Sequence, residues 1–486
     1  MADSRQLFRI LAGLGTVLFA FSTRAGTDDE LLTGPAFAKF HLTLTSGCRE
    51  EAAGPFYYNQ NAEAQTQWAI PPFFCRTLTP EADWSEWDFL YPLADYRRFG
   101  KEHRLQLLQF LSFSGGESFE ENAAHRSTFF PFYFRQRSKD TNLNYTAVFP
   151  FGGHLENRLF RDDIKFILFP IYSETRKKDV VTDNYVYPMF DRRRGNGLAG
   201  WQAWPVAGHN RKTPTLATNS MQETETVGGF DKWFAAWPFY FKTRDGLGTT
   251  NPASSLTIVP FYSQARAPLR DQTSYGFPFG FNSIHDREQG YEEHDLLWPL
   301  FVQAHGSKTV HRWFPFYSRA EHDGLESIFY GFIIYKYNRL QSPPLDRRRT
   351  RILYFLYSDT VERNTQSHDF KRRVDVWPFY SYHRELDGKR RTQVLAVLEP
   401  FLPNNRTIVR EYSQVWSFWR AEKNPQTGAT SQSLLWNLYR HERVGKSKKA
   451  SLLFGLFQYQ SSPEGGHWRI FYHNFGRQPE RAEAAH

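Results

Sequence analysis

Large apolar side chains recur along this chain in short groups, and polar or charged residues follow each group. The clearest form of the group is an aromatic or branched residue, a proline, a second large apolar residue and a tyrosine, with an arginine a few positions later. Such groups surround Pro131, Pro170, Pro238, Pro260, Pro315 and Pro378. A pattern repeated this often predicts one supersecondary unit that is used many times.

The spacing of the groups indicates which unit is repeated. In the two regular runs, residues 131–205 and 238–315, successive prolines of the pattern lie 16 to 22 residues apart. Stacked coils of a solenoid tolerate little change in length, whereas a meander absorbs such changes in its turns. The irregular spacing therefore favours an antiparallel meander.

Each copy of the pattern predicts a β-strand, because aromatic and β-branched residues suit a pleated surface. The segment 164–173 is an example, with Pro170 inside the expected strand. Segments between copies, such as 244–248, are charged and contain glycine, as hairpin loops do. Strands of about ten residues joined by loops of about eight would give roughly 18 to 20 strands.

The predicted fold class is all-β, as a single large antiparallel meander closed into a β-barrel. A proline cannot donate to a strand ladder, so each one is expected at a bulge, and bulges at one height would bend every strand alike and help to close the sheet. The alternative is a soluble multi-sheet sandwich or propeller that buries the same apolar positions.

The N-terminus carries an export signal. Arg5 and Arg9 precede the apolar run 10–21, which is too short to span a bilayer as a helix. Thr23 and Ala25 place small residues where a signal peptidase cleaves, so residues 1–25 are predicted to be a signal peptide.

The rest of the chain divides into an N-terminal segment (26–54), a repeat β domain (55–475) and a polar tail (476–486). A competing targeting signal is the segment 44–48, which resembles a bacterial lipobox and would make Cys48 a lipidation site. The charged or polar residues Lys39 and His41 interrupt the apolar stretch that a lipobox needs.

The sequence contains two cysteines, Cys48 and Cys75. A pair of cysteines in an exported protein favours a disulfide, because the compartments outside the cytoplasm are oxidising. The other interpretation is two unpaired buried thiols.

The sequence predicts no catalytic, cofactor-binding or metal-binding site. Gly195 to Gly200 match the dinucleotide fingerprint, but they lead into an expected strand and not into a helix. His285 and His294 lie in the densest cluster of acidic residues and histidine, which has no zinc spacing and is interpreted as a solvated loop. We therefore expect a protein that is not an enzyme and needs no cofactor.

The chain has a formal net charge of +9, and arginines follow many of the aromatic groups. Export argues against nucleic acid as the partner. Arginine beside Trp and Tyr suits the phosphates of membrane lipid or lipopolysaccharide. The other interpretation is that these charges keep strand edges soluble.

The repeats at 89–93, 297–301 and 377–380 resemble those of uncharacterised exported bacterial proteins built from many Trp-Pro-Phe-Tyr type strands. The resemblance implies a bacterial, exported setting and no activity or site. The expected function is that of an outer-membrane barrel that acts as a pore, transporter or envelope scaffold. The alternative is a soluble periplasmic or surface protein that binds a glycan or a protein partner through rows of Tyr and Trp.

Overall fold

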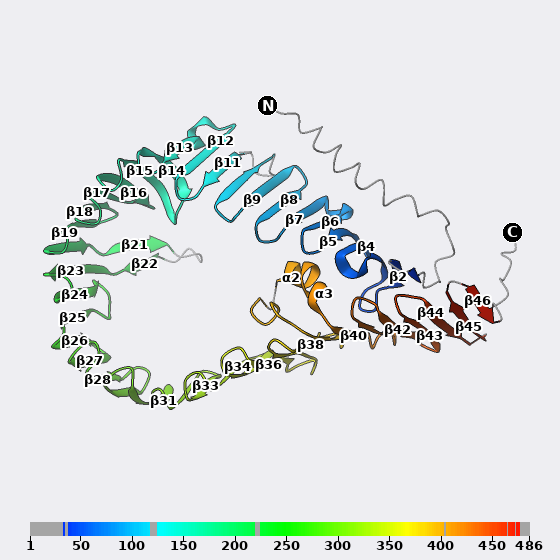
Figure 1. Cartoon of the computed structure of the whole chain (residues 1–486). Coiled ribbons are helices and arrows are strands. Elements are labelled where there is room, and N and C mark those ends of the chain that lie inside the picture. The colour runs from blue at the N-terminus through cyan, green and yellow to red at the C-terminus, as the bar shows by residue number, and fades with distance from the viewer. Residues whose placement is uncertain are drawn as a thin grey trace.

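The computed structural model describes residues 33–34, 37–116, 124–218, 224–402, 405–463, 465–471 and 473–476. The expected signal peptide and the polar tail after residue 476 lie outside the described residues. The fold is all-β: 44 strands form one antiparallel sheet, and two further strands form a separate hairpin. The sheet is a ribbon one strand high that curls into an elongated ring (Figure 1).

The strands follow one another along the ribbon in chain order, and two short helices interrupt them near the C-terminal end. The first strands are β1 (Thr33–Gly34), β2 (Phe37–His41), β3 (Gly47–Ala52), β4 (Tyr57–Ala62), β5 (Gln65–Ile70), β6 (Phe74–Thr79), β7 (Trp84–Phe89), β8 (Ala94–Phe99), β9 (Glu102–Leu107), β10 (Leu111–Gly115), β11 (Ala124–Phe129), β12 (Tyr133–Ser138), β13 (Tyr145–Val148), β14 (Gly152–Arg158) and β15 (Arg161–Ile167). The middle strands are β16 (Tyr172–Lys177), β17 (Val180–Tyr185), β18 (Phe190–Gly195), β19 (Leu198–Ala203), β20 (Ala207–Lys212), β21 (Thr215–Thr218), β22 (Thr224–Val227), β23 (Gly229–Ala235), β24 (Tyr240–Leu247), β25 (Ala253–Ile258), β26 (Tyr262–Ala267), β27 (Arg270–Tyr275), β28 (Phe281–Asp286), β29 (Tyr291–Leu296), β30 (Phe301–His305) and β31 (Lys308–Trp313). The last elements are β32 (Tyr317–His322), β33 (Leu325–Tyr330), β34 (Tyr335–Ser342), β35 (Leu345–Ile352), β36 (Tyr357–Asn364), β37 (Phe370–Val376), β38 (Tyr380–Arg384), β39 (Arg390–Val394), α2 (Arg406–Glu411), α3 (Ser413–Trp416), β40 (Trp419–Lys423), β41 (Thr430–Leu434), β42 (Tyr439–Val444), β43 (Ser447–Leu452), β44 (Phe457–Ser462), β45 (Gly465–Ile470) and β46 (His473–Gly476).

The strands are shorter and more numerous than the sequence predicts. Segment 164–173, expected to be one strand, is the end of β15, a turn and the start of β16. The expected count of 18 to 20 strands is therefore wrong, because each repeat is a hairpin of two short strands and not one strand with a loop.

The prolines of the repeat lie in the turns and not within strands. At Pro170, the amide of Ile171 donates to the carbonyl of Leu168 at 2.8 Å and the peptide bond before the proline is cis, which is the geometry of a type VI turn. The same arrangement occurs at the other five marker prolines, Pro131, Pro238, Pro260, Pro315 and Pro378. A missing N–H does no harm in these turns, so the bulges expected within strands are not needed.

Adjacent proline turns are also linked to one another. The carbonyl of Pro170 accepts a hydrogen bond of 2.7 Å from Tyr187 in the next turn, and Pro378 accepts one of 2.7 Å from Ala396. The turns therefore extend the backbone ladder of the sheet along one rim of the ribbon.

The two faces of the ribbon follow from the strand register. Thr77 and Glu86 face α2, which lies inside the ring, so we call their face the inner face and the opposite one the outer face (Figure 1). The largest buried apolar cluster lies on the inner face of β12 to β15 and comprises Phe134, Tyr145, Ala147, Leu155 and Phe166. Elsewhere the inner face buries many Ser, Asp and Asn side chains and smaller apolar clusters, one of which comprises Val302, Ala304 and Val310.

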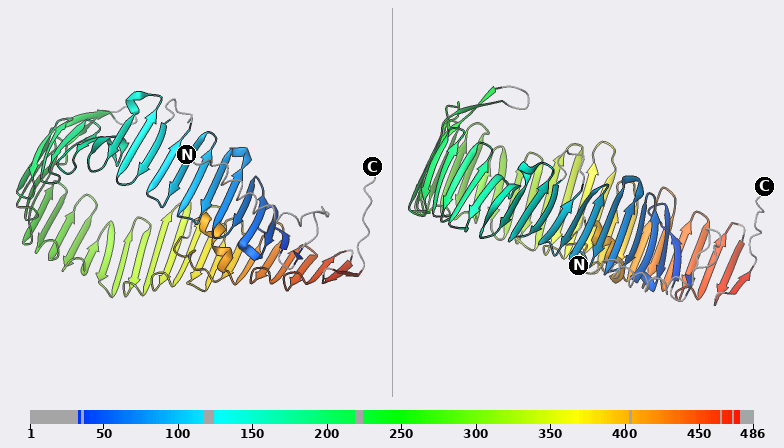
Figure 2. Two further views of the ribbon diagram at one scale, coloured as in Figure 1. Left: turned by 45° about the horizontal axis from the view of Figure 1, so that its top comes forward. Right: turned by 90° about the horizontal axis from the view of Figure 1, so that it is seen from above.

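The sheet is not closed by strand pairing. Among the described residues, β1 pairs only with β2 and β46 only with β45. Figure 2 shows that the strands near the two ends of the ribbon lie one behind the other, with the helices between them. The closed barrel expected from the sequence is therefore not part of this fold as described.

The start of the sheet also differs from the expected domain boundary. Strands β1 to β3 precede residue 55 and pair with the rest of the ribbon. In the described part of the chain, no helix has the length and apolar character needed to cross a membrane.

Candidate functional site

The proline turns give one rim of the ribbon an apolar surface, which we call the aromatic rim. Large side chains at these turns, and at the turns without proline on the same rim, are exposed, among them Phe130, Phe132, Phe151, Leu168, Ile171, Val206, Trp237, Phe239, Phe261, Phe279, Trp298, Phe316, Phe332, Tyr354, Phe379, Trp436, Phe454 and Phe471. An exposed apolar surface of this extent is unusual for a soluble monomer and marks an interaction surface.

The opposite rim, which we call the charged rim, consists of polar turns such as 178–179, 287–290 and 323–324. A large apolar exception on it is Phe160, between β14 and β15, which is 97% exposed. The two rims of the ribbon therefore differ in chemistry along almost the whole ring.

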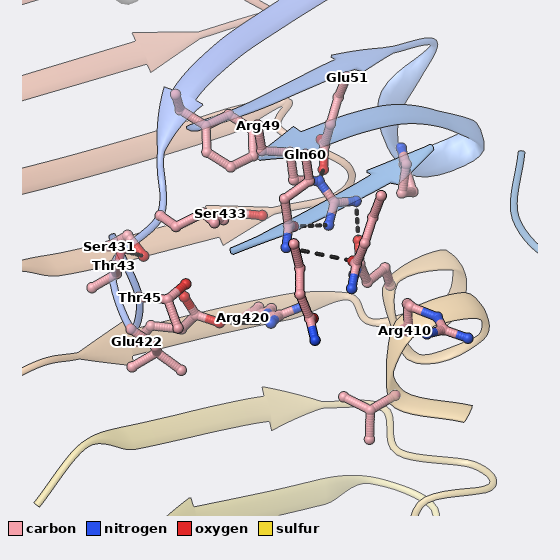
Figure 3. Close-up of a pocket in the computed structure, with 18 of the residues that line it drawn as sticks. Thr43, Thr45, Arg49, Glu51, Gln60, Arg410, Arg420, Glu422, Ser431 and Ser433 are labelled. Atoms are coloured by element: carbon pink, nitrogen blue, oxygen red, sulfur yellow. Dashed lines mark hydrogen bonds and ion pairs between the residues drawn. The ribbon is translucent and has the colours of Figure 1, made fainter. Parts of the chain in front are cut away.

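Where the two ends of the ribbon overlap, α2 and α3 fill part of the space between their inner faces (Figure 1). A cavity of about 580 Å³ remains beside the helices, and we call it the junction pocket. Its polar lining comprises His41, Thr43, Thr45, Arg49, Glu51, Gln60, Gln65, Gln67, Thr77, Glu86, Arg97, Arg406, Thr407, Arg410, Gln414, Ser417, Arg420, Glu422, Ser431, Ser433, Asn437 and Arg440. Figure 3 shows some of the lining side chains, which come from the blue N-terminal strands, the helices and the C-terminal strands.

Helix α2 is short and is held by its cap and its buried face. The side chain of Asn405 accepts a hydrogen bond from the amide of Ile408 at 3.2 Å, which satisfies a free donor of the first turn. Thr407, Ile408 and Glu411 of the helix are buried. This arrangement directs Arg410, in the last turn, toward the inner face of β6 and β7.

Arg410 joins the helix to the N-terminal strands. Its guanidinium donates to the hydroxyl of Thr77 at 2.9 Å and to a carboxylate oxygen of Glu86 at 3.3 Å, and it also pairs with Asp88. Glu411, the next residue, is fully buried beside the same groups. Burial and then the charge of Asp88 raise the pKa of Glu411 to about 9, so this carboxyl is protonated at neutral pH.

Arg49 makes the corresponding contacts for β3. Its guanidinium lies 2.6 Å from Glu51 and 3.7 Å from the centre of the Tyr58 ring, and it donates to Gln60 on β4 and to Gln414 on α3. A charge removed from water is stable only with partners of this kind. Arg49 therefore attaches the N-terminal strands to the helices.

Further contacts join the N-terminal strands directly to β41 and β42. The buried hydroxyls of Thr43 and Ser431 lie 2.7 Å apart, and Asn437 donates to Glu51. The guanidinium of Arg440 stacks on the ring of Phe40 at 3.3 Å. The ring is thus completed by side-chain contacts between the inner faces of its two ends, not by backbone pairing.

The residues singled out in the sequence do not meet in this pocket. Cys48 and Cys75 are both free thiols; the register places Cys48 on the outer face of β3 and Cys75 on the inner face of β6. Two strands separate them and their side chains point to opposite faces, so the expected disulfide is not formed. Cys75 is buried and contacts Tyr58 and Thr77.

The histidine cluster lies in strands and not in the expected loop. His285 on β28 and Glu292 on β29 are cross-strand partners whose side chains lie 2.9 Å apart on the outer face. His294 faces outward next to Ser283. Within the described ranges, no group of three or more metal-ligating side chains comes together. Residues 195–200 form a tight hairpin that leads from β18 into the strand β19 and not into a helix, as expected from the sequence.

The sequence analysis did not predict the junction pocket, because the pocket is formed by two segments, 40–97 and 406–440, that lie more than 300 positions apart in the chain. The only local signal is Asn405 before a short apolar run, which is a weak helix start. The chain matches no known protein-family model, and no curated protein is similar to it.

Proposed function

We propose that this protein is an exported, non-enzymatic scaffold of the bacterial cell envelope that docks on a membrane through its aromatic rim. The observation that carries the proposal is the concentration of exposed large apolar side chains in the turns of one rim. Burying each such side chain in lipid would contribute roughly 1.5 to 3 kcal/mol. A ring that carries many of them has a strong tendency to associate with a lipid surface.

The order of residues away from the rim supports a lipid partner. On the outer face, the position next to the turn is usually aromatic or branched, and tyrosine occupies it at Tyr133, Tyr172, Tyr185, Tyr240, Tyr262, Tyr275, Tyr317, Tyr330, Tyr335, Tyr357, Tyr380 and Tyr439. Two residues further from the rim, the same face carries basic side chains that include Arg135, Lys165, Arg192, Lys242 and Arg319. From the rim inward, the protein therefore presents apolar side chains, then tyrosines, then basic side chains. A lipid leaflet presents its acyl chains, its interface and its phosphates in the same order.

The height of the apolar band argues for docking in one leaflet rather than a spanning barrel. Most strands have six residues, which at about 3.3 Å per residue gives roughly 20 Å. A spanning strand needs about nine to eleven residues with an apolar band of about 25 Å. Here the band consists of the turn and the first outer position only.

The proposal is tested by sedimentation with vesicles of phosphatidylcholine and phosphatidylglycerol. The test variant is Phe261→Glu with Phe316→Glu, two rim positions that are 73% and 75% exposed. The matched control is Phe160→Glu, the same change at an exposed position of the charged rim. Exposed turn positions tolerate such changes within about 0.5 kcal/mol of folding stability.

The unchanged protein and Phe160→Glu should sediment with vesicles, and the rim variant should lose at least about tenfold in affinity. Equal binding by all three proteins would contradict docking through the rim. No binding by any of them would favour the alternative, a soluble periplasmic or surface protein whose Tyr and Trp rows contact a glycan or a protein.

A further inference from the structure

We propose that the junction pocket binds an acidic, hydroxyl-rich sugar, the chemical class of a uronic acid oligosaccharide. The pocket goes beyond lipid docking and does not depend on it. Its wall residues Gln67, Thr77 and Glu86 are in register at mid-strand, and Gln65 and Trp84 lie further toward the charged rim.

The lining offers the groups that a sugar requires. Gln60, Gln65, Gln67 and Gln414 supply amides, and several Ser and Thr residues supply hydroxyls. These groups both donate and accept, so they match the hydroxyls of a sugar ring. Trp84 adds an aromatic surface. A volume of about 580 Å³ lies within the ordinary range of small-ligand sites.

The balance of donors and acceptors indicates that the sugar is acidic. The lining contains six arginines and three glutamates. Glu51, Glu86 and Glu422 already accept from arginine or asparagine side chains. Their acceptor capacity is therefore largely used within the protein.

Donor capacity remains on the arginines. The Nε of Arg410 is buried and makes no hydrogen bond among the described residues. Arg406 lines the pocket from the exposed start of α2, and no protein group in the described part of the chain pairs with it. Guanidinium groups with free N–H bind carboxylates in a bidentate manner, and this favours a sugar that carries a carboxylate.

The test is isothermal titration of the full-length protein with three probes: digalacturonate, maltose and inorganic phosphate. Maltose has the hydroxyls without the charge, and phosphate has the charge without the sugar. The test variant is Arg406→Gln, which removes an exposed, unpaired cation. The matched control is Arg135→Gln, an exposed arginine on the outer face of β12.

Digalacturonate should bind with one site per chain, more tightly than either of the other probes. Arg406→Gln should weaken it by about tenfold or more, and Arg135→Gln should leave it unchanged. Equal binding of maltose would contradict the acidic ligand, and equal binding of phosphate would contradict the sugar. No binding, or binding that Arg406→Gln does not change, would overturn the site. Vesicle sedimentation is a separate measurement, so failure of this site leaves rim docking standing.

Discussion

The carboxyl group of Glu411 lies next to Arg410, a residue of the junction pocket, and its pKa is strongly raised. It is fully buried, with Asp88 beside it and Arg410 adjacent in the chain. Burial acts first and Asp88 second to raise its pKa to about 9, and burial also raises the pKa of Asp88. The folded protein therefore holds a proton that the unfolded chain releases above about pH 4.5.

The sign of the pH dependence follows from this proton. Between the unfolded pKa near 4.5 and the folded value of about 9, the folded state binds more protons, so the free energy of unfolding falls as pH rises. The slope would reach about 1.4 kcal/mol per pH unit. We expect Glu411→Gln, which mimics the protonated carboxyl, to flatten this fall in denaturant titrations from pH 5 to pH 9. A variant with the same pH profile as the unchanged protein would show that Glu411 is ionised when folded.

At the scale of elements, the ribbon repeats one hairpin whose two turns differ in chemistry. The sequence allows prediction of the all-β class, the antiparallel order and the polar turns, because these depend on local composition. It does not locate the proline turns, because apolar residues such as Phe169 and Ile171 read equally well as the middle of a strand. Only the pairing of Ile167 with Tyr172 shows that the chain reverses between them.

The candidate site could not be predicted for a different reason. Its contacts join residues that lie far apart in the chain, such as Thr43 with Ser431 and Thr77 with Arg410. No local sequence pattern predicts which parts of the inner face come together when a long ribbon curls and its two ends overlap. The expectation that the protein has no catalytic site rests on local motifs, and it stays a prediction.

Helix α2 gives a prediction at the element scale. Arg410→Ala should destabilise the fold by about 3 to 5 kcal/mol, because it leaves Asp88 buried without its cation and Glu86 with Arg97 alone. Arg406→Ala, four residues earlier on the same helix and exposed, should change stability by less than about 0.5 kcal/mol. Denaturant unfolding of the two variants measures the difference. Similar stabilities for both would mean that Arg410 does not hold the helix to β6 and β7.

For the whole molecule, the consequence of the fold is a ring with two unlike rims. Because the prolines of the repeat lie in turns on one rim, many exposed aromatic side chains are gathered along that rim. The contacts at the junction pocket hold the ends of the ribbon together and so keep the ring intact. A long apolar rim backed by tyrosine and arginine suits a surface of lipid more than a groove for one peptide.

The central claim is that the aromatic rim, and not the charged rim, enters the lipid. The most direct test places an environment-sensitive nitrobenzoxadiazole label on a cysteine introduced by Phe261→Cys or by Phe160→Cys. Both variants also carry Cys48→Ser, so that the only other thiol is the buried Cys75. On addition of phosphatidylcholine and phosphatidylglycerol vesicles, we expect the emission of the label at position 261 to shift to the blue and rise, and that at position 160 to stay unchanged. An unchanged signal at position 261, or the same shift at both positions, would contradict docking through the aromatic rim.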